Sequence, residues 1–166
     1  MKILFMLVLF AAPVAAQDLV FSPNATEICA AESTDLIVAE ACVGRSSDLC
    51  MTENGNDGSS TVGMGYCLSR ELDYWDARLN IAYKSLRQVD RVYDAELDEL
   101  GSSAPRRVAV LRDMQRAWIG YRDAACAYEY SGWGGGSGGG PAHASCMMRV
   151  TGEQALHLEA TLEERQ

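Results

Sequence analysis

The sequence predicts an all-α fold, an antiparallel helical hairpin or bundle with disulfide-braced N-terminal helices and a glycine-rich loop. Two long segments carry apolar residues at alternating spacings of three and four, which is the period of an amphipathic helix. Six cysteines, a number that can pair completely, accompany these segments. No segment shows a convincing strand pattern, in which apolar and polar residues alternate. A helical core held by covalent bridges is therefore expected.

The N-terminus has the pattern of a secretory signal peptide over residues 1–16. Lys2 precedes an apolar run, and small residues end at Ala16. The run is shorter than the roughly 20 apolar residues that span a bilayer. We expect cleavage after Ala16, a single mature domain over 17–166, and a periplasmic or secreted location. Because Gln17 rather than a cysteine follows the expected cut, no membrane anchor is expected.

The chain is acidic, with 23 Asp and Glu against 14 Lys and Arg and a formal net charge of -9. Removal of the signal peptide would take away Lys2 and lower this charge by one further unit. An acidic balance disfavours binding to nucleic acid or to anionic membranes, which need basic patches, and it speeds encounter with a cationic partner. It also keeps exported proteins dispersed, which needs no partner at all.

All six cysteines lie beyond the expected cleavage site, and an even number in an oxidising compartment predicts a disulfide framework. Many pairings are possible, and chain order favours a local scheme in which neighbours join: Cys29 with Cys42, Cys50 with Cys67, and Cys126 with Cys146. No metal site is expected, because there is no Cys-x-x-Cys pair and His143 and His157 stand apart in the sequence.

The N-terminal part, about 26–66, is expected to form a cysteine-rich hairpin. A short helix capped by Thr26 would precede a longer helix from about 35 to 51. Residues 53–60 are rich in Asn, Gly and Ser and are expected to form a surface loop.

The core of the domain is expected over 67–162. Its first helix, with apolar residues from Leu68 to Leu100, would be roughly 50 Å long, so we expect a bend or break near 87–91. Gly101 suits a C-terminal cap, and Pro105 suits the first turn of a second helix that packs antiparallel on the first.

The segment 132–140 is almost wholly glycine, and no regular structure is expected there. It lacks the Gly-x-x-x-x-Gly-Lys-Ser/Thr order of a phosphate loop, so phosphate binding is not expected. After this segment, Thr151 and Gln154 match a capping box that would open a last helix through Leu162.

Two groups of residues could carry a function. Trp133 stands within the glycine segment and is a side chain of the kind that dominates protein interfaces, although it could equally fold back on the core. His143, beside the same segment, could titrate usefully, although a lone loop histidine is more often solvated. Arg122 and Asp123 could form a polar recognition patch near Cys126. The alternative is a partly buried bond from Arg122 to a carboxylate on another helix, drawn from Glu71, Asp73 or Asp76.

Residues spread from Cys67 to Thr151 match the pattern of a known family. They are Cys67, the stretch 76–83, the stretch 115–126 with the order Trp-x-x-Tyr-Arg-Asp-x-x-Cys, Gly135-Gly136-Ser137, Cys146 and Thr151. With this pattern, which covers about 50–162, the chain resembles the LprI-type lysozyme inhibitors. The resemblance implies a helical domain exported by bacteria, a bridge between Cys126 and Cys146, and inhibition of lysozyme. The glycine segment is longer here than in the family, and Gln154 replaces a common arginine.

The leading hypothesis is an exported binding protein that inhibits a cationic hydrolase of the lysozyme type, with residues 132–143 as the contact element. Its candidate binding residues are Trp133, Ser137, His143, Arg122 and Asp123. The alternative is a structural or assembly partner in the cell envelope with no hydrolase target. Catalytic residues and cofactors are not expected, because no nucleophile with a base stands out. The sequence does not fix the oligomeric state.

Overall fold

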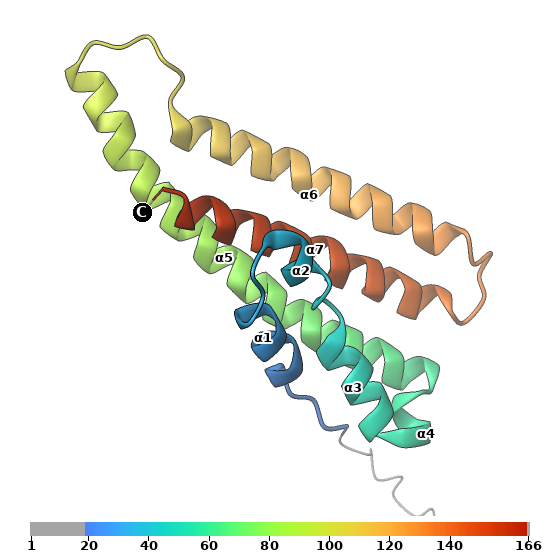
Figure 1. The fold of residues 1–166 in the computed structure, drawn as a ribbon. Coiled ribbons are helices and arrows are strands. Elements are labelled where there is room, and N and C mark those ends of the chain that lie inside the picture. Colours follow the sequence, from blue (N-terminus) through green and yellow to red (C-terminus); the bar gives the residue numbers. More distant parts are fainter. Residues whose placement is uncertain (1–18, 166) are drawn as a thin grey trace, which may run out of the picture.

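The computed structural model describes residues 19–165 as an all-helical protein, which confirms the predicted fold class (Figure 1). The expected signal peptide lies outside the described residues. Along the chain the helices are α1 (Asn24–Ala31), α2 (Leu36–Glu40), α3 (Arg45–Glu53), α4 (Gly55–Gly58), α5 (Thr61–Glu99), α6 (Arg107–Ser131) and α7 (Gly139–Glu163). No helix in this part of the chain is long and apolar enough to cross a membrane.

The long helix α5 is continuous, so of the bend or break expected near 87–91 the break does not occur, and Figure 1 shows the helix curving toward its C-terminal end. Its side chains explain the continuity: Leu86 and Asp90 are fully buried, and Asp90 accepts a hydrogen bond from Arg165 at the C-terminal end of the chain. Tertiary packing therefore keeps α5 helical through residues 87–91. Gly101 ends α5 with a φ of 60°, and the Ser102 amide donates to the Leu97 carbonyl at 2.9 Å. This is a Schellman motif, and it confirms the expected glycine cap.

Helix α6 begins with a cap supplied by α5. The Asp94 carboxylate accepts hydrogen bonds from the backbone amides of Arg107 at 2.7 Å and Val108 at 3.0 Å. A carboxylate at a helix N-terminus satisfies free amides and interacts favourably with the helix dipole. Asp94 of α5 therefore links the two helices of the hairpin.

Helix α7 lies between α5 and α6 and makes its most extensive contact with α5 (Figure 1). It begins at Gly139, so Thr151 is a buried residue in mid-helix and the expected capping box is wrong. Helix α6 runs back antiparallel to α5, as expected, but packs mainly on α7. A Cβ atom on Gly152 would lie 3.1 Å from the Trp75 ring and 2.9 Å from Val43, so this glycine permits the close approach of α5 and α7.

The second of the expected N-terminal helices is divided in two. The segment 35–51 divides at Gly44, whose φ of 101° is a conformation that favours glycine, and becomes α2 and α3. Thr26 is buried within α1 rather than capping it: its amide and hydroxyl exchange hydrogen bonds of 2.9 Å with the hydroxyl and amide of Ser46. The loop expected over 53–60 contains the short helix α4.

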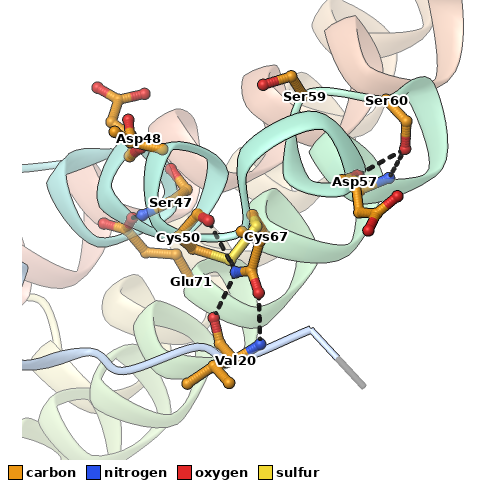
Figure 2. The surroundings of a disulfide bond; sticks show 12 residues. Val20, Ser47, Asp48, Cys50, Asp57, Ser59, Ser60, Cys67 and Glu71 are labelled. Atoms are coloured by element: carbon orange, nitrogen blue, oxygen red, sulfur yellow. Dashed lines mark hydrogen bonds between the residues drawn. A yellow bond between two sulfur atoms is a disulfide. The ribbon is translucent and has the colours of Figure 1, made fainter. Parts of the chain in front are cut away.

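A buried carboxylate joins these helices to α5. Glu71 is fully buried and accepts hydrogen bonds from the Thr26 hydroxyl at 2.7 Å, the Gly44 amide at 2.8 Å, the Ser47 amide at 2.6 Å and the Trp75 indole at 3.2 Å. Two of these donors are free amides of the first turn of α3. Figure 2 shows Glu71 beside Ser47, close to a disulfide between α3 and α5.

All three disulfides follow the local scheme: Cys29–Cys42, Cys50–Cys67 and Cys126–Cys146. The first closes the hairpin of α1 and α2, the second ties α3 to α5, and the third ties α6 to α7. The apolar core between the helices is built mainly from α5 and α7. Its buried members are Ala39, Leu68, Trp75, Leu79, Ala82, Leu86, Leu111, Met148, Ala155, Leu156 and Leu158.

Candidate functional site

The end of the molecule where α6 turns into α7, residues 128–143, is called here the α6–α7 tip. The Cys126–Cys146 bridge lies directly behind it, with both cysteines buried and with Val150 and Trp118 packed around them. The bridge fixes the spacing of the two helices at the point where the chain reverses. The tip is therefore a short connection on a rigid base.

Trp133 lies across the start of α7 and remains half exposed, at 51%. A Cβ atom on Gly138 would lie 2.2 Å from its ring, so the indole rests on bare glycine backbone. Gly134 and Gly135, with φ values of 55° and 85°, turn the chain between them. The expected lack of regular structure is confirmed for 132–138, whereas residues 139 and 140 belong to α7. One face of the indole therefore packs on the glycine backbone, and part of the ring is exposed to solvent.

His143 and Ser137 occupy different environments at the tip. His143 lies in α7, is partly buried, and its Nδ1 is 3.2 Å from the carbonyl oxygen of Cys126. Because a carbonyl oxygen only accepts, this hydrogen bond requires the proton on Nδ1. The Tyr130 ring meets the imidazole edge to face at 6.3 Å. His143 is therefore not a solvated loop residue but links α7 to α6. Ser137 is exposed.

Arg122 and Asp123 pair with each other, with 2.9 Å between Arg122 Nη2 and Asp123 Oδ1. The Arg122 guanidinium also lies over the Trp118 ring at 5.0 Å. The alternative of a bond from Arg122 to Glu71, Asp73 or Asp76 is wrong, because Glu71 is occupied by α1 and α3, Asp73 pairs with Arg70, and Asp76 accepts from Asn80. Arg122 precedes the end of α6 by nine residues, about 14 Å along the helix. It therefore does not form one cluster with Trp133.

A second feature runs along α6 and was not recognised from the sequence as one continuous stripe. Helix α6 carries exposed apolar residues spaced by four and three, which border α7 at the Val110 end: Val110, Met114, Ala117, Tyr121, Ala124 and Tyr128. The sequence contains this pattern beside the stripe that includes Leu111 and Cys126. Periodicity gives both stripes and does not say which of two adjacent faces a neighbouring helix covers. The buried one faces α7.

A hollow of about 570 Å³ lies on the other side of the molecule, between α1, α2, α5 and α7. Arg78 crosses it, donating to both carboxylate oxygens of Glu159 and to the Tyr74 hydroxyl at 2.9 Å. Burial raises the pKa of the Tyr74 phenol. Burial lowers the pKa of Arg78, but the Glu159 carboxylate outweighs this and the net pKa is raised. Arg78 and Glu159 are 81 residues apart, and no local signal in the sequence links them.

Neither surface has the arrangement of a metal centre. No group of three His, Cys, Asp or Glu side chains within residues 19–165 could hold a metal ion. What the tip presents instead is contact area: Trp133, Tyr128 with 82% of its surface exposed, and a glycine backbone around them. Large aromatic side chains held by a rigid base are typical of protein interfaces.

The fold and this surface define a small, disulfide-linked, all-helical protein with an aromatic face. The chain belongs to the family described as lysozyme inhibitor LprI, whose family model matches residues 50–158. It is 27% identical over 138 residues to an uncharacterised 17.7 kDa protein encoded in the puhA 5′ region of Rhodobacter capsulatus, covering 82% of this chain and 84% of that protein. It is also 27% identical over 104 residues to an uncharacterised protein of Rhizobium meliloti, covering 63% of this chain and 75% of that protein. No solved structure matches the chain.

The matched region runs from Cys50 in α3 to Leu158 near the end of α7. It contains the whole of α5 and α6, the tip and two of the three disulfides. The Cys29–Cys42 hairpin of α1 and α2 lies outside it. The family is one of inhibitors and not one defined by a catalytic activity. The disulfides fit a protein that resides in an oxidising compartment.

Proposed function

We propose that this protein is exported to the periplasm or the cell exterior, where it inhibits a cationic peptidoglycan hydrolase of the lysozyme type. The observation that carries the proposal is the family match, which covers the helices and bridges that build the α6–α7 tip. Such an inhibitor needs no catalytic group, only a surface that covers the substrate cleft of its target.

The tip suits this role because it is narrow, preformed and aromatic. The bridge between α6 and α7 and the seat of Trp133 on Gly138 fix its conformation before binding. A preorganised surface loses less conformational entropy when it binds. Trp133 and Tyr128 are then the side chains that would enter or border the cleft.

The charge of the protein supports the choice of a cationic target. With 23 acidic against 14 basic side chains, the protein attracts a cationic enzyme over long range and speeds encounter. Contacts at the tip itself are mainly aromatic and backbone groups. Salt should therefore slow association more than it weakens the formed complex.

The experiment is a peptidoglycan lysis assay with a cationic lysozyme and the oxidised mature protein. We expect inhibition that weakens as salt rises, and a loss of at least about tenfold in inhibition for Trp133→Ala, the usual effect of truncating a central aromatic. Ile37→Ala, which removes an 80% exposed side chain from α2, is the matched control and should inhibit as the wild type does. Undiminished lysis at a large molar excess of protein would remove the proposal.

The exposed stripe on α6 favours a second candidate, a structural or assembly partner in the cell envelope. Its spacing of three and four matches the seam that one helix presents to another. In that case Tyr121→Glu would abolish recovery of an envelope complex by cross-linking, and the inhibition assay would show no activity for the wild type. Inhibition that survives Tyr121→Glu assigns the function to the tip.

A further inference from the structure

A groove between α5 and α6 carries a charge opposite to that of the protein as a whole. Its volume is about 480 Å³, and four arginines line it against a single carboxylate, Asp76. The arginines are Arg87 on α5 and Arg112, Arg116 and Arg122 on α6. In a chain with a net charge of -9, this concentration of cations is a local reversal. The set is called here the arginine groove.

Two of these arginines form no ion pair within 4 Å among residues 19–165, although the Asp113 charge acts on Arg116 from the neighbouring turn. Arg112 and Arg122 pair with Asp113 and Asp123, whereas no ion pair involves Arg87 or Arg116. The Nε atom of Arg87 is buried and has no acceptor within the described part of the chain. A buried guanidinium donor without an acceptor is costly, and a bound anion would satisfy it.

Aromatic rings hold the guanidinium groups in place. Arg87 lies over the Tyr83 ring at 5.6 Å and Arg122 over the Trp118 ring at 5.0 Å. Both rings line the same groove. Stacking restricts the rotamers of a long side chain before any ligand arrives, and the planar guanidinium fork matches the geometry of a carboxylate. Arg87 and Arg122 are therefore preorganised donors.

The groove is elongated and its surface is mixed. Its α5 wall runs from Asp76 to Arg87, about 16 Å at 1.5 Å per residue, which is the length of about five residues of extended peptide. The partly buried Trp118 and the exposed Ile119 lie among the arginines. A chain with alternating acidic and apolar side chains meets both kinds of surface. An inorganic anion or a sulfated sugar meets only the charges.

We propose that the arginine groove binds an extended acidic peptide, with carboxylates of the peptide on Arg87 and Arg116 and its apolar side chains on Trp118 and Ile119. Because α5 and α6 are antiparallel, Arg87 lies toward the Arg112 end and Asp76 toward the Arg122 end. The carboxylates of the peptide therefore gather at the Arg87 end. The site is separate from the tip and does not require that the protein inhibit a hydrolase.

The test is calorimetric titration of the oxidised mature protein with the blocked peptide acetyl-Glu-Leu-Glu-Leu-Glu-amide, with no hydrolase present. We expect saturable binding that weakens as salt rises. Arg116→Gln, at an exposed side chain, should weaken binding about tenfold, the usual effect of losing one charge-assisted hydrogen bond. Arg87→Gln should do the same, and its thermal unfolding is measured to confirm that it folds. Arg70→Gln, which removes an exposed charge of α5 outside the groove, should leave affinity unchanged.

Three controls decide against the proposal. Equal binding of the peptide with Gln in place of Glu would show that carboxylates are not recognised. Equal weakening by Arg70→Gln would show attraction to the whole surface and not to the groove. Tighter binding of a sulfated disaccharide than of the peptide would assign the groove to another ligand class, and no binding at millimolar peptide would remove the site.

Discussion

Replacing Glu71 by Gln tests whether one buried carboxylate holds the N-terminal helices on α5. Oε1 of Glu71 accepts from Thr26, Gly44 and Trp75, and Oε2 accepts from the Ser47 amide at 2.6 Å. An amide has one acceptor and one donor end. In its better orientation the glutamine keeps the three bonds of Oε1 and turns its own N–H groups against the Ser47 amide.

The size of the effect follows from these bonds. Losing the bond to Ser47 costs about 1.5–3 kcal/mol, and the three remaining bonds each lose about 1 kcal/mol when the acceptor becomes neutral. The smaller desolvation cost of a neutral side chain offsets part of this sum. We therefore expect Glu71→Gln to lower the free energy of unfolding by about 2–4 kcal/mol.

The assay is denaturant unfolding with the disulfides intact, followed by far-ultraviolet circular dichroism, together with hydrogen exchange at the amides of Gly44 and Ser47. Asp73→Asn on the same helix is the control, because Asp73 is exposed and pairs only with Arg70; it should change stability by less than about 0.5 kcal/mol. A Glu71→Gln protein as stable as this control, with unchanged exchange at Gly44 and Ser47, would refute the reasoning.

Two further predictions concern the tip and α3. Gly138→Ala should displace the Trp133 ring, because the new Cβ would lie 2.2 Å from it, and lower the free energy of unfolding by about 1–3 kcal/mol with a changed tryptophan emission spectrum. Gly140→Ala, which meets nothing within 4 Å, should preserve the spectrum and destabilise nothing; equal effects of the two substitutions would contradict the seat assigned to Trp133. In α3, desolvation and then the charge of Glu71 raise the pKa of Asp48. A carboxyl whose pKa is raised by folding makes the protein less stable as pH rises through that pKa. The Asp48→Asn protein should therefore become more stable relative to the wild type as pH rises from about 4. Thermal unfolding of both proteins across this pH range is the measurement. A stability advantage that shrinks with rising pH would show that folding does not raise the pKa of Asp48.

The long helices could be predicted because their pattern repeats many times. Ten apolar positions from Leu68 to Leu100 all have helical spacing, so the pattern predicts a helix and no other structure for this segment. Gly101 marks the end of α5 in the sequence as in the structure. The disulfide scheme was accessible for a related reason: each cysteine pairs with its neighbour in sequence, so the bridges close short segments. Both predictions depend on local information.

The start of α7 could not be predicted, because its first residues have low helix propensity. Gly139, Gly140 and Pro141 open the helix, and only Pro141 suits a first turn. Tertiary contacts compensate: Gly139 is buried under the Tyr130 ring, and Cys146 bonds to α6 within two turns. Helix formation in proteins rests mostly on such packing, which a single sequence does not contain.

The polar residues of the site were harder to predict than the helices because their partners are distant in sequence. Glu71, Asp73 and Asp76 were equally plausible partners of Arg122, and none of them holds it. A cross-helix pair that does form, between Arg78 and Glu159, joins residues with no shared local pattern. Because α5 carries a carboxylate every few residues, many pairings of its carboxylates with arginines are possible. Only the packing of α1, α3 and α7 on α5 selects among these pairings.

The distribution of these charges gives the protein surfaces of opposite sign, which the net charge alone does not describe. At 100° per residue, Tyr74 and Arg78 lie on the face of α5 opposite to Tyr83 and Arg87. The first pair borders the hollow under α1 and α2, whose rim also carries Glu27, Asp35 and Glu163, and the second borders the arginine groove. One helix thus separates an acidic surface from a basic one, so a cationic partner and an anionic peptide have no need to compete. A substitution in the groove should accordingly change affinity for the peptide while leaving the attraction of a cationic enzyme in place.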